Sequence, residues 1–373
     1  MKVVLFSYHY FESKLRAGFH HLAEAYWDLG WEVVFVTAPL SPLSRLVRDP
    51  RLHDGVLEEA NRPKAVRDRL TSYPLYSRVH PANLRLGALN RLTGPLLVGA
   101  YRRSKLGALE PELASADLII FESTPAIVLA PVVRALAPRA RLVYRVSDDL
   151  EVLRVHPAAI EAEWQALSVF DYVSSPSRYS ARKLGVAREV DYQQHAIAKH
   201  LFDIETTSPY DDGVNAVWVG KALLDPAFLD AASGRLPAWS FHVVGPARRS
   251  VSRPNVFWHG EVPYERTIPF LKHADVGLAA YGGHEGRVPG YLADSMKIVQ
   301  YAYCGLPVVA PSPLRSERPH VFYYDFGDAG SIEAALRAAH AAVKRPDLAQ
   351  TIPSWHELAT SLADGRGGTS AGG

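Results

Sequence analysis

The sequence predicts an α/β protein made of two doubly wound domains. At 373 residues the chain is longer than one ordinary hydrophobic core needs, and its length suits two domains. Short apolar runs alternate with helical patterns in both halves, which is typical of parallel sheets covered by helices on both faces. A polar segment at 195–212 interrupts this alternation, and we place the linker there. The pattern therefore predicts two doubly wound domains that face each other.

The N-terminal series opens with a β-α-β unit. Residues 3–7 and 31–37 are apolar runs of strand length. Between them, apolar residues recur at helical spacing before Gly30 ends the helix; they are Phe19, Leu22, Tyr26 and Leu29. Such a unit implies parallel strands joined by a right-handed crossover. Further strands are predicted at 118–122, 141–146, 172–175 and 190–194.

Two other segments of this half are less regular. Residues 41–110 are basic and interrupted by prolines, so we expect helices there and little strand. A helix is expected over 125–136, with Pro131 as a kink site.

The second series follows the linker with the same alternation. Strands are predicted at 214–220, 240–245, 256–259, 276–281 and 307–311. Helices are predicted at 226–232, 264–273, 295–304 and 331–344. The domains expected are 1–200 and 213–345, then a C-terminal helix at 346–363 that returns to the N-terminal domain, and a disordered Gly/Ser-rich tail at 364–373.

The amino-acid composition excludes several classes of protein and of functional site. Apolar residues make up 48% and charged residues 21% of the chain, as in globular proteins. The net charge is only +2, so no nucleic-acid partner is expected. Cys304 is the one cysteine, which rules out an intrachain disulfide and a cysteine-based zinc site and favours a reducing compartment. No run of 18 apolar residues is present, and the N-terminus lacks the pattern of a signal peptide.

The positive charge is concentrated in one region. Residues 41–110 hold 13 Lys/Arg and 6 Asp/Glu, which suits anionic lipid or a phosphate-bearing acceptor, although a merely solvated face remains the alternative. Within it, 85–109 interleaves leucines with arginines. Such a stretch can lie on a membrane surface, or it can be a core helix whose arginines reach out to water. Gly94-Pro95 interrupts the pattern.

The segment 290–310 carries the most informative motif. It reads as a loop, a candidate N-cap at Ser295, a helix ended by Gly305, and a strand. A helix N-terminus favours an anion, yet Lys297 in the first turn has the wrong charge for the helix dipole, so an anion beside it would explain it. Gln300 lies one turn further on the same face, within reach of a base or ribose. The alternative is a plain cap with a solvated lysine.

Two adjacent carboxylates follow the strand at 141–146. Asp148 and Asp149 would lie where open α/β sheets bind ligands, and a carboxylate there can act as a general base. The alternatives are an Asp N-cap for the next helix, or a divalent-metal site, which adjacent and therefore diverging side chains disfavour.

In the second half, Glu261 follows a predicted strand and suits a pair of ribose hydroxyls, while Tyr281 and the glycines after it suit a loop that closes over a nucleotide. A surface glutamate and a wet loop are the alternatives. The fingerprints GxGxxG, GxxxxGK[ST] and GxSxG are absent, so dehydrogenase, P-loop and serine-hydrolase interpretations lack support.

Several stretches resemble one known family. They are SYHYFESKLRAGFHH at 7–21, LIIFES at 118–123, RLVYRVSDDL at 141–150, GEVPYERTIPFLKHADVGLAAY at 260–281 and YLADSMKIVQYAYCGLP at 291–307. They are similar to the GumK-type inverting β-glucuronosyltransferases of xanthan biosynthesis. The resemblance covers most of 1–310, and the stretch at 291–307 is the most specific.

The resemblance implies a GT-B fold, with two doubly wound, Rossmann-like domains facing across a cleft. The N-terminal domain would bind the acceptor and associate with the membrane, and the C-terminal domain would bind the UDP-sugar. The implied reaction moves glucuronate from UDP-glucuronate to a lipid-diphosphate-linked oligosaccharide in exopolysaccharide synthesis, with inversion and without a metal or other cofactor. The implied location is peripheral, at the cytoplasmic face of the inner membrane, with an anionic membrane surface as a partner.

The family's functional residues correspond to positions of this chain. Asp148 matches the catalytic base and Glu261 the ribose-binding glutamate. The remaining donor-binding positions correspond to Tyr281, Met296, Lys297 and Gln300. Ala222 stands where the family has a methionine near the uracil, and this departure concerns the sugar more than the nucleotide.

Three alternatives stay open from sequence alone. The first is the same reaction with glucose, mannose or galacturonate as the sugar. The second is a non-catalytic nucleotide-sugar-binding protein. The third is a phosphorylase or epimerase-like enzyme that acts on free nucleotide sugar.

Overall fold

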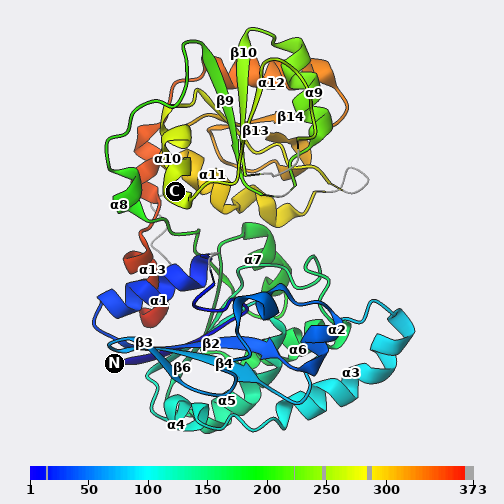
Figure 1. Cartoon of the computed structure of the whole chain (residues 1–373), viewed down its shortest axis with the longest axis vertical. Coiled ribbons are helices and arrows are strands. Elements are labelled where there is room, and N and C mark those ends of the chain that lie inside the picture. Colours follow the sequence, from blue (N-terminus) through cyan, green and yellow to red (C-terminus); the bar gives the residue numbers. More distant parts are fainter. Residues whose placement is uncertain (14–15, 222, 246–248, 284–287, 366–373) are drawn as a thin grey trace. The chain divides into compact units, whose positions relative to one another are not determined.

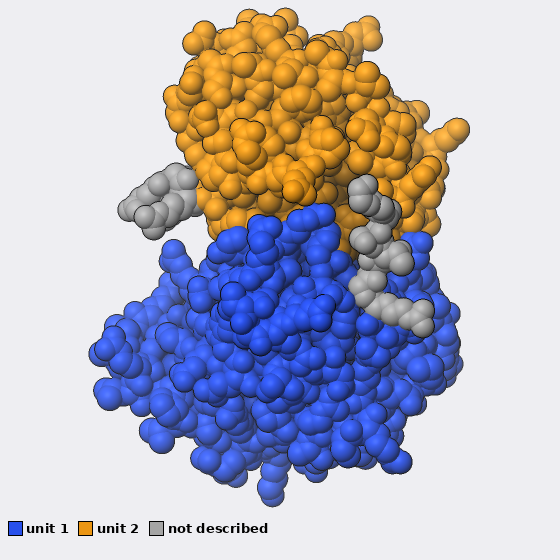
Figure 2. All heavy atoms as spheres, turned by 180° about the vertical axis from the view of Figure 1, so that it is seen from behind, with its two compact units in different colours: residues 1–193, 355–373 blue, residues 194–354 orange. Residues whose placement is uncertain are grey.

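The computed structural model describes residues 1–13, 16–221, 223–245, 249–283 and 288–365. The chain forms two compact units, coloured separately in Figure 2. Unit 1 comprises Met1–Gln193 and Trp355–Gly373, and unit 2 comprises Gln194–Ser354. The chain thus leaves unit 1 a few residues before the predicted linker and re-enters it at Trp355. The predicted tail beyond residue 365 lies outside the described residues.

Unit 1 is built on an eight-stranded sheet in the order β3-β4-β2-β1-β5-β6-β7-β8 (Figure 1). The strands are β1 (Lys2–Ser7), β2 (Glu32–Leu40), β3 (Lys64–Arg67), β4 (Leu70–Tyr76), β5 (Leu118–Glu122), β6 (Arg141–Arg145), β7 (Tyr172–Ser175) and β8 (Asp191–Tyr192). All neighbouring strands are parallel except β3 and β4. Strands β1, β2, β5 and β6 are almost wholly buried, which explains why they read as continuous apolar runs.

The expectation of little strand within 41–110 is wrong. Strands β3 and β4 both lie there, and β4 pairs with β2 over most of its length. Pro74 removes one backbone donor from β4, which argued against a strand. The sheet accommodates Pro74 because its backbone faces away from β2: its carbonyl accepts from the N–H of Asn61, and the pairing of β4 with β3 reaches only Ser72.

Helices surround this sheet. They are α1 (Gly18–Asp28), α2 (Pro42–Leu46), α3 (Gly87–Arg102), α4 (Leu109–Ala114), α5 (Ala130–Leu136), α6 (Pro157–Ala166), α7 (Arg178–Gly185) and α13 (Trp355–Asp364), with 3₁₀ helices at Pro50–Asp54, Pro125–Leu129 and Leu167–Val169. The helix predicted over 125–136 is a 3₁₀ turn that leads into α5. Pro131 lies in the first turn of α5, where its missing N–H costs nothing, and it is not a kink.

The C-terminal helix packs on α1. The hydroxyl of Tyr26 donates a hydrogen bond of 2.8 Å to the carbonyl of Ala359. The predicted single helix at 346–363 is instead a 3₁₀ helix at Pro346–Thr351 in unit 2, followed by α13 in unit 1. The first of these segments begins with a proline and contacts the core of unit 2 through the partly buried Leu348, whereas α13 buries Leu358, Ala359 and Leu362 in unit 1.

Unit 2 has a six-stranded, entirely parallel sheet in the order β11-β10-β9-β12-β13-β14 (Figure 1). The strands are β9 (Val214–Val219), β10 (Trp239–Val244), β11 (Val256–Gly260), β12 (Val276–Leu278), β13 (Val308–Pro311) and β14 (Val321–Tyr324). The helices are α8 (Lys199–Phe202), α9 (Pro226–Arg235), α10 (Tyr264–His273), α11 (Met296–Tyr303) and α12 (Ala329–Ala341), with 3₁₀ helices at Gly290–Asp294, Ser312–Leu314 and Pro346–Thr351. Strand β14 is the one that the sequence analysis did not predict.

The predicted α/β fold class is confirmed by these two parallel sheets. In a parallel sheet all strands end at the same edge, where functional residues gather. In unit 1, the residues that follow β1, β5 and β6 meet at that edge. In unit 2, the turn after β9 and the start of α11 meet in the same way, because Gly220 lies against Lys297.

Candidate functional site

The centre of the candidate site in unit 2 is the ammonium group of Lys297, in the first turn of α11. The side chain is buried, with 8% of the residue exposed. No described residue accepts a hydrogen bond from its Nζ. The nitrogen lies 2.6 Å from the ring centroid of Trp218 and 4.7 Å from that of Tyr281. Burial lowers the pKa of Lys297 well below its ordinary value. An anion at this point would satisfy the ammonium and restore its charge.

Glycines leave space beside this lysine. A Cβ on Gly220 would lie 3.3 Å from both Cε and Nζ of Lys297. A Cβ on Gly245 would lie 2.5 Å from the carbonyl oxygen of Gly220, so the turns after β9 and β10 touch backbone to backbone. Both glycines have positive φ angles, of 149° and 122°. The close approach and the backbone conformation together require glycine at these turns.

The start of α11 differs from the predicted cap. Ser295 occupies the N-cap position, but its side chain makes no capping hydrogen bond. Its Oγ instead lies 2.7 Å from the hydroxyl of Tyr281. The N–H groups of the first helical turn therefore have neither an intrahelical acceptor nor a serine cap, which is the arrangement that suits an oxyanion.

Of the other donor-site residues predicted in unit 2, Met296 and Gln300 lie on α11, and Glu261 follows β11. Gln300 is 7% exposed, and its amide donates to the hydroxyl of Tyr264 at 3.0 Å. Met296 is partly buried at the start of α11. Glu261 is exposed directly after β11 and pairs with Lys221 at 2.7 Å. Ala222, the departure from the family pattern, lies outside the described residues.

In unit 1, Asp148 follows β6. Its backbone N–H donates to the Oγ of Ser123 at 2.8 Å. Its carboxylate has no hydrogen-bond donor among the residues that the structure describes. Burial, and then the negative charge of Glu122, raise the pKa of Asp148 to about 6, and a smaller contribution from His9 opposes them. This is a carboxyl group that can take up and release a proton near neutral pH.

Asp149 is held differently. Lys183, on α7, lies 3.0 and 2.8 Å from its two carboxylate oxygens. The backbone N–H of Glu151 donates to the same carboxylate at 2.8 Å. Asp149 is 6% exposed, so it is a buried ion-pair partner that fixes the turn after Asp148. The structure thus distinguishes Asp149, whose carboxylate is paired, from Asp148, whereas their adjacent positions in the sequence did not distinguish them.

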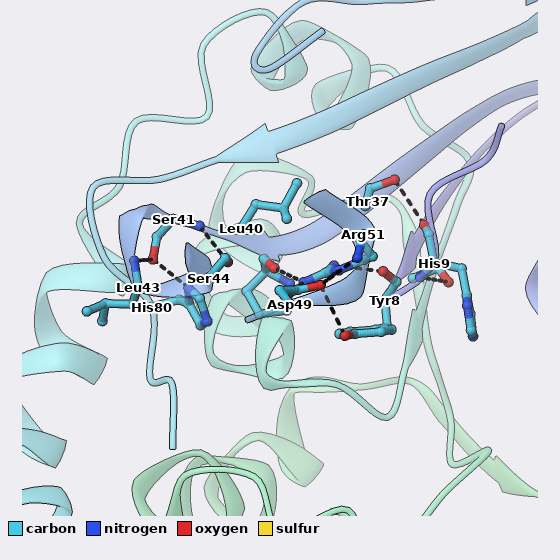
Figure 3. Close-up of polar contacts among 12 residues, drawn as sticks. Tyr8, His9, Thr37, Leu40, Ser41, Leu43, Ser44, Asp49, Arg51 and His80 are labelled. Carbon is cyan, nitrogen blue, oxygen red and sulfur yellow. Dashed lines mark hydrogen bonds and ion pairs between the residues drawn. The ribbon is translucent and has the colours of Figure 1, made fainter. Parts of the chain in front are cut away.

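A polar cluster lies after β1 and β2, where the 3₁₀ helix at Pro50–Asp54 and its N-cap Asp49 meet Tyr8 and His9 (Figure 3). Arg51 forms an ion pair with Asp49 and donates to the backbone carbonyls of Tyr8 and Pro39 at 2.7 and 2.6 Å. Its guanidinium lies 3.8 Å from the ring centroid of Tyr8. His9 is the next residue, and its carbonyl accepts from Thr37 at 3.0 Å. The cluster fixes the backbone that presents Tyr8 and His9.

Helix α3 carries the basic, leucine-rich stretch. It continues through Gly94-Pro95, and a Cβ on Gly94 would lie 2.9 Å from that of Ala158 on α6, so the helices touch there. Both sequence interpretations fit part of this stretch: Tyr101 is buried, as in a core helix, whereas Leu92 and Leu96 on α3 and Leu86 before it are 76%, 74% and 61% exposed. Arg85, Arg91 and Arg103 are exposed as well.

No helix among the described residues is both long and apolar enough to cross a bilayer. No cluster of three or more His, Cys, Asp or Glu side chains within the described ranges could hold a metal ion.

Sequence reasoning missed several residues of these sites. Trp218 lies within a predicted strand, and a buried aromatic residue in an apolar run carries no functional signal. Glu122 was likewise the end of a strand. The glycines at 220 and 245 each follow a predicted strand, and that placement was the available signal for a close backbone approach.

The fold of the chain is the GT-B architecture, which it shares with solved structures of glycosyltransferases. Sucrose-phosphate synthase from Thermosynechococcus elongatus superposes with a TM-score of 0.59 at 15% identity, over 97% of each chain. HepE from Anabaena, in a complex with UDP and glucose, superposes with a TM-score of 0.52 at 15% identity, over 98% of this chain and 95% of its own. At such identities the likeness establishes the fold.

Sequence comparison gives the family. Residues 5–176 match the family model of the N-terminal domain of glucuronosyltransferase GumK. The UDP-glucuronate:glycolipid 2-beta-glucuronosyltransferase of Xanthomonas campestris pv. campestris is 32% identical over 340 residues, which cover 90% of this chain and 83% of that protein. The chain therefore belongs to the GumK family of glucuronosyltransferases, as its resemblance predicted, and is a glycosyltransferase.

Proposed function

We propose that this protein transfers glucuronate from UDP-glucuronate to a hydroxyl group of a lipid-diphosphate-linked oligosaccharide, with inversion at the anomeric carbon, in exopolysaccharide synthesis. The relative from Xanthomonas, a UDP-glucuronate:glycolipid glucuronosyltransferase, supports both the donor and the kind of acceptor. Within the chain, the observation that carries the proposal is the buried ammonium of Lys297, which has no hydrogen-bond acceptor among the described residues.

Unit 2 is the donor-binding unit in this proposal. Lys297 and the N–H groups at the start of α11 would take the diphosphate, or Lys297 would take the glucuronate carboxylate. Either anion would supply the hydrogen-bond acceptor that the buried amino group lacks among the described residues and would stabilise its charged form. Gln300 and Tyr281 would contact the nucleotide, together with Met296. Glu261 would exchange its exposed pairing with Lys221 for the two ribose hydroxyls.

Unit 1 is the acceptor-binding unit and supplies the base. Asp148 would remove the proton from the acceptor hydroxyl as that oxygen attacks the anomeric carbon from the face opposite UDP. A raised pKa of about 6 suits a base, because the group is ionised at neutral pH and holds a proton better than an ordinary aspartate. Asp149 does not suit this role, since Lys183 and a backbone N–H occupy its oxygens.

The negative charge that develops on the leaving UDP would be stabilised by Lys297 and the helix N-terminus, so the proposed mechanism uses no metal ion. Donors that already point at the developing charge need no reorganisation during the reaction. The proposal therefore predicts transfer in the presence of a chelator.

A lipid-linked acceptor would bring the protein to a membrane surface, and we propose a peripheral position at the cytoplasmic face of the inner membrane. Helix α3 supports this assignment, because it exposes leucines next to arginines. An anionic membrane surface is accordingly a proposed partner.

The alternative donors are UDP-glucose and UDP-galacturonate, or a mannose nucleotide. A direct test is to supply each nucleotide sugar with a detergent-solubilised lipid-diphosphate oligosaccharide and to measure sugar on the lipid. UDP-glucuronate should be used in preference to UDP-glucose. Release of UDP without transfer to lipid would point to a hydrolytic or epimerase-like activity, and binding without turnover would point to a non-catalytic protein.

A further inference from the structure

Glu122, the last residue of β5, is a buried carboxylate at the edge of the sheet that carries Asp148. It is 6% exposed, and the hydroxyl of Ser7 donates to its Oε2 at 2.6 Å. The backbone N–H of Tyr8 donates to the same oxygen at 3.0 Å. The Oγ of Ser7 in turn accepts from the backbone N–H of His9 at 3.1 Å. Glu122 thus anchors the turn that follows β1 and leads into His9.

Ser123, the residue after Glu122, contacts the segment that follows β6, on the other side of β5 from β1. The Oγ of Ser123 accepts the backbone N–H of Asp148 at 2.8 Å. Because β5 lies between β1 and β6 in the sheet, Glu122 and Ser123 connect the ends of both flanking strands. One strand end thereby fixes where Asp148 lies and where the His9 turn lies relative to it.

We propose that Glu122 is a positioning residue for the base Asp148: it holds the Ser7–Tyr8–His9 turn in place and puts a second buried carboxyl group at the end of the strand next to the one that leads to Asp148. This inference rests on the proposed function, since it needs Asp148 to act as the base. It adds a residue to that mechanism without requiring Glu122 to touch either substrate.

The charges around Asp148 come from three directions. Glu122 at the end of β5 raises its pKa, and Asp149 in its own segment raises it slightly. His9 on the turn after β1 lowers it, and the pKa of His9 is itself lowered by burial and then by Arg51. Lys183 on α7 forms an ion pair with Asp149 and so offsets part of the negative charge of that carboxylate. Among these charges Glu122 contributes most to the raised pKa of Asp148. Burial also raises the pKa of Glu122 itself, to about 6, so the two carboxyl groups titrate in the same pH range as a coupled pair.

Two substitutions separate the two roles of Glu122. Glu122→Gln keeps an oxygen that can accept from Ser7 and Tyr8 but removes the charge. The acid limb of the kcat profile should then move to lower pH, by about 0.5–1 unit, because a like charge no longer opposes ionisation of Asp148. Glu122→Ala also releases the turn, so kcat should fall about 10–100-fold while the KM for UDP-glucuronate, which binds to unit 2, stays within about twofold.

Glu163→Gln is the matched control. Glu163 is likewise a buried carboxyl of unit 1 whose pKa is raised, to about 7, and its hydrogen-bond partner is Tyr144. Its substitution should leave the acid limb where it is in the wild type. Ser7→Ala is a second probe of the turn, which keeps the Glu122 charge and removes one of the two donors. It should lower kcat without moving the acid limb.

The experiment measures glucuronate transfer to a detergent-solubilised lipid-diphosphate oligosaccharide between about pH 5 and 9 for the full chain, with Asp148→Asn in parallel. An unmoved acid limb in Glu122→Gln together with unchanged kcat in Ser7→Ala would overturn the proposal for Glu122. Full activity of Asp148→Asn would instead refute Asp148 as the base, so the two failures are distinguishable. If Glu122→Ala does not fold, the Gln and Ser7 variants decide the matter alone.

Discussion

Lys183 holds both carboxylate oxygens of Asp149, at 3.0 and 2.8 Å, while the neighbouring Asp148 carboxylate has no such partner among the described residues. Adjacent residues therefore have opposite roles. Asp149 fixes the turn after β6, and Asp148 remains available for a proton.

The first prediction follows from this difference. Asp148→Asn should reduce turnover about 10²–10⁴-fold, the usual contribution of general-base catalysis, and should leave UDP binding intact. Asp149→Asn should instead lower the melting temperature, because Lys183 loses a buried partner. Steady-state kinetics and thermal unfolding of both variants check this. An Asp149→Asn enzyme that is folded and inactive, beside an active Asp148→Asn enzyme, would show that the base is misassigned by one residue.

The pH dependence of turnover is the second prediction. Asp148 must be ionised to accept a proton, and burial raises its pKa to about 6. kcat should therefore rise as the pH increases through about 6 and level off above it, rather than near the value of about 3.9 for an ordinary aspartate. A profile that stays flat from pH 7 down to 5 would contradict this account of the carboxyl group.

Lys297 gives the third prediction. A buried ammonium without an acceptor costs stability in the unliganded protein, so Lys297→Ala or Lys297→Met should not lower the melting temperature. The same change should weaken UDP-glucuronate binding by about 1.5–3 kcal/mol, because it removes a charge-assisted contact. Calorimetry with UDP and UDP-glucuronate distinguishes the two candidate anions: loss for both indicates the diphosphate, and loss for UDP-glucuronate alone indicates the carboxylate. Wild-type affinity for both would reject the assignment.

A linked prediction concerns protons. The pKa of Lys297 is lowered in the free protein, and a bound anion should raise it again. Donor binding should therefore take up a proton at pH values above the lowered pKa. Titration calorimetry in two buffers of different ionisation enthalpy measures that uptake, and Lys297→Met should abolish it. An uptake that persists in Lys297→Met belongs to another group.

The sequence predicted an element correctly where the residues of that element carry the signal themselves. It failed where the structure depends on contacts with residues from elsewhere in the chain. The parallel strands were predictable because burial on both faces makes them apolar runs, as in β1 and β5. Strand β4 was not, because Pro74 is tolerated there only as its backbone faces Asn61 and not β2, and the sequence does not show to which side a residue of a strand faces.

The candidate sites show the same division. Lys297 was predictable because a positive charge at a helix start conflicts with the helix dipole. Trp218, which its ammonium faces, lies far away in the chain and looks like any core aromatic. The choice between Asp148 and Asp149 depends on Lys183, which is 34 residues from Asp149 and had no sequence signal.

Membrane association is the fifth prediction. Neutralising the exposed Arg85, Arg91 and Arg103 should reduce sedimentation with vesicles that contain anionic lipid, and so should high salt, since the Debye length falls to about 3 Å at 1 M. Arg337 on α12, which is exposed and belongs to unit 2, is the matched control. Equal sedimentation with neutral and anionic vesicles would count against an electrostatic contact through α3.

The most direct test of the central claim is a transfer assay with the full chain, UDP-glucuronate carrying a labelled sugar, and a detergent-solubilised lipid-diphosphate oligosaccharide, in the presence of a chelator. The account predicts that label appears on the lipid, that UDP-glucose gives much less transfer, and that Asp148→Asn nearly abolishes it. Labelled lipid at the same rate from UDP-glucose, or full transfer by Asp148→Asn, would contradict it.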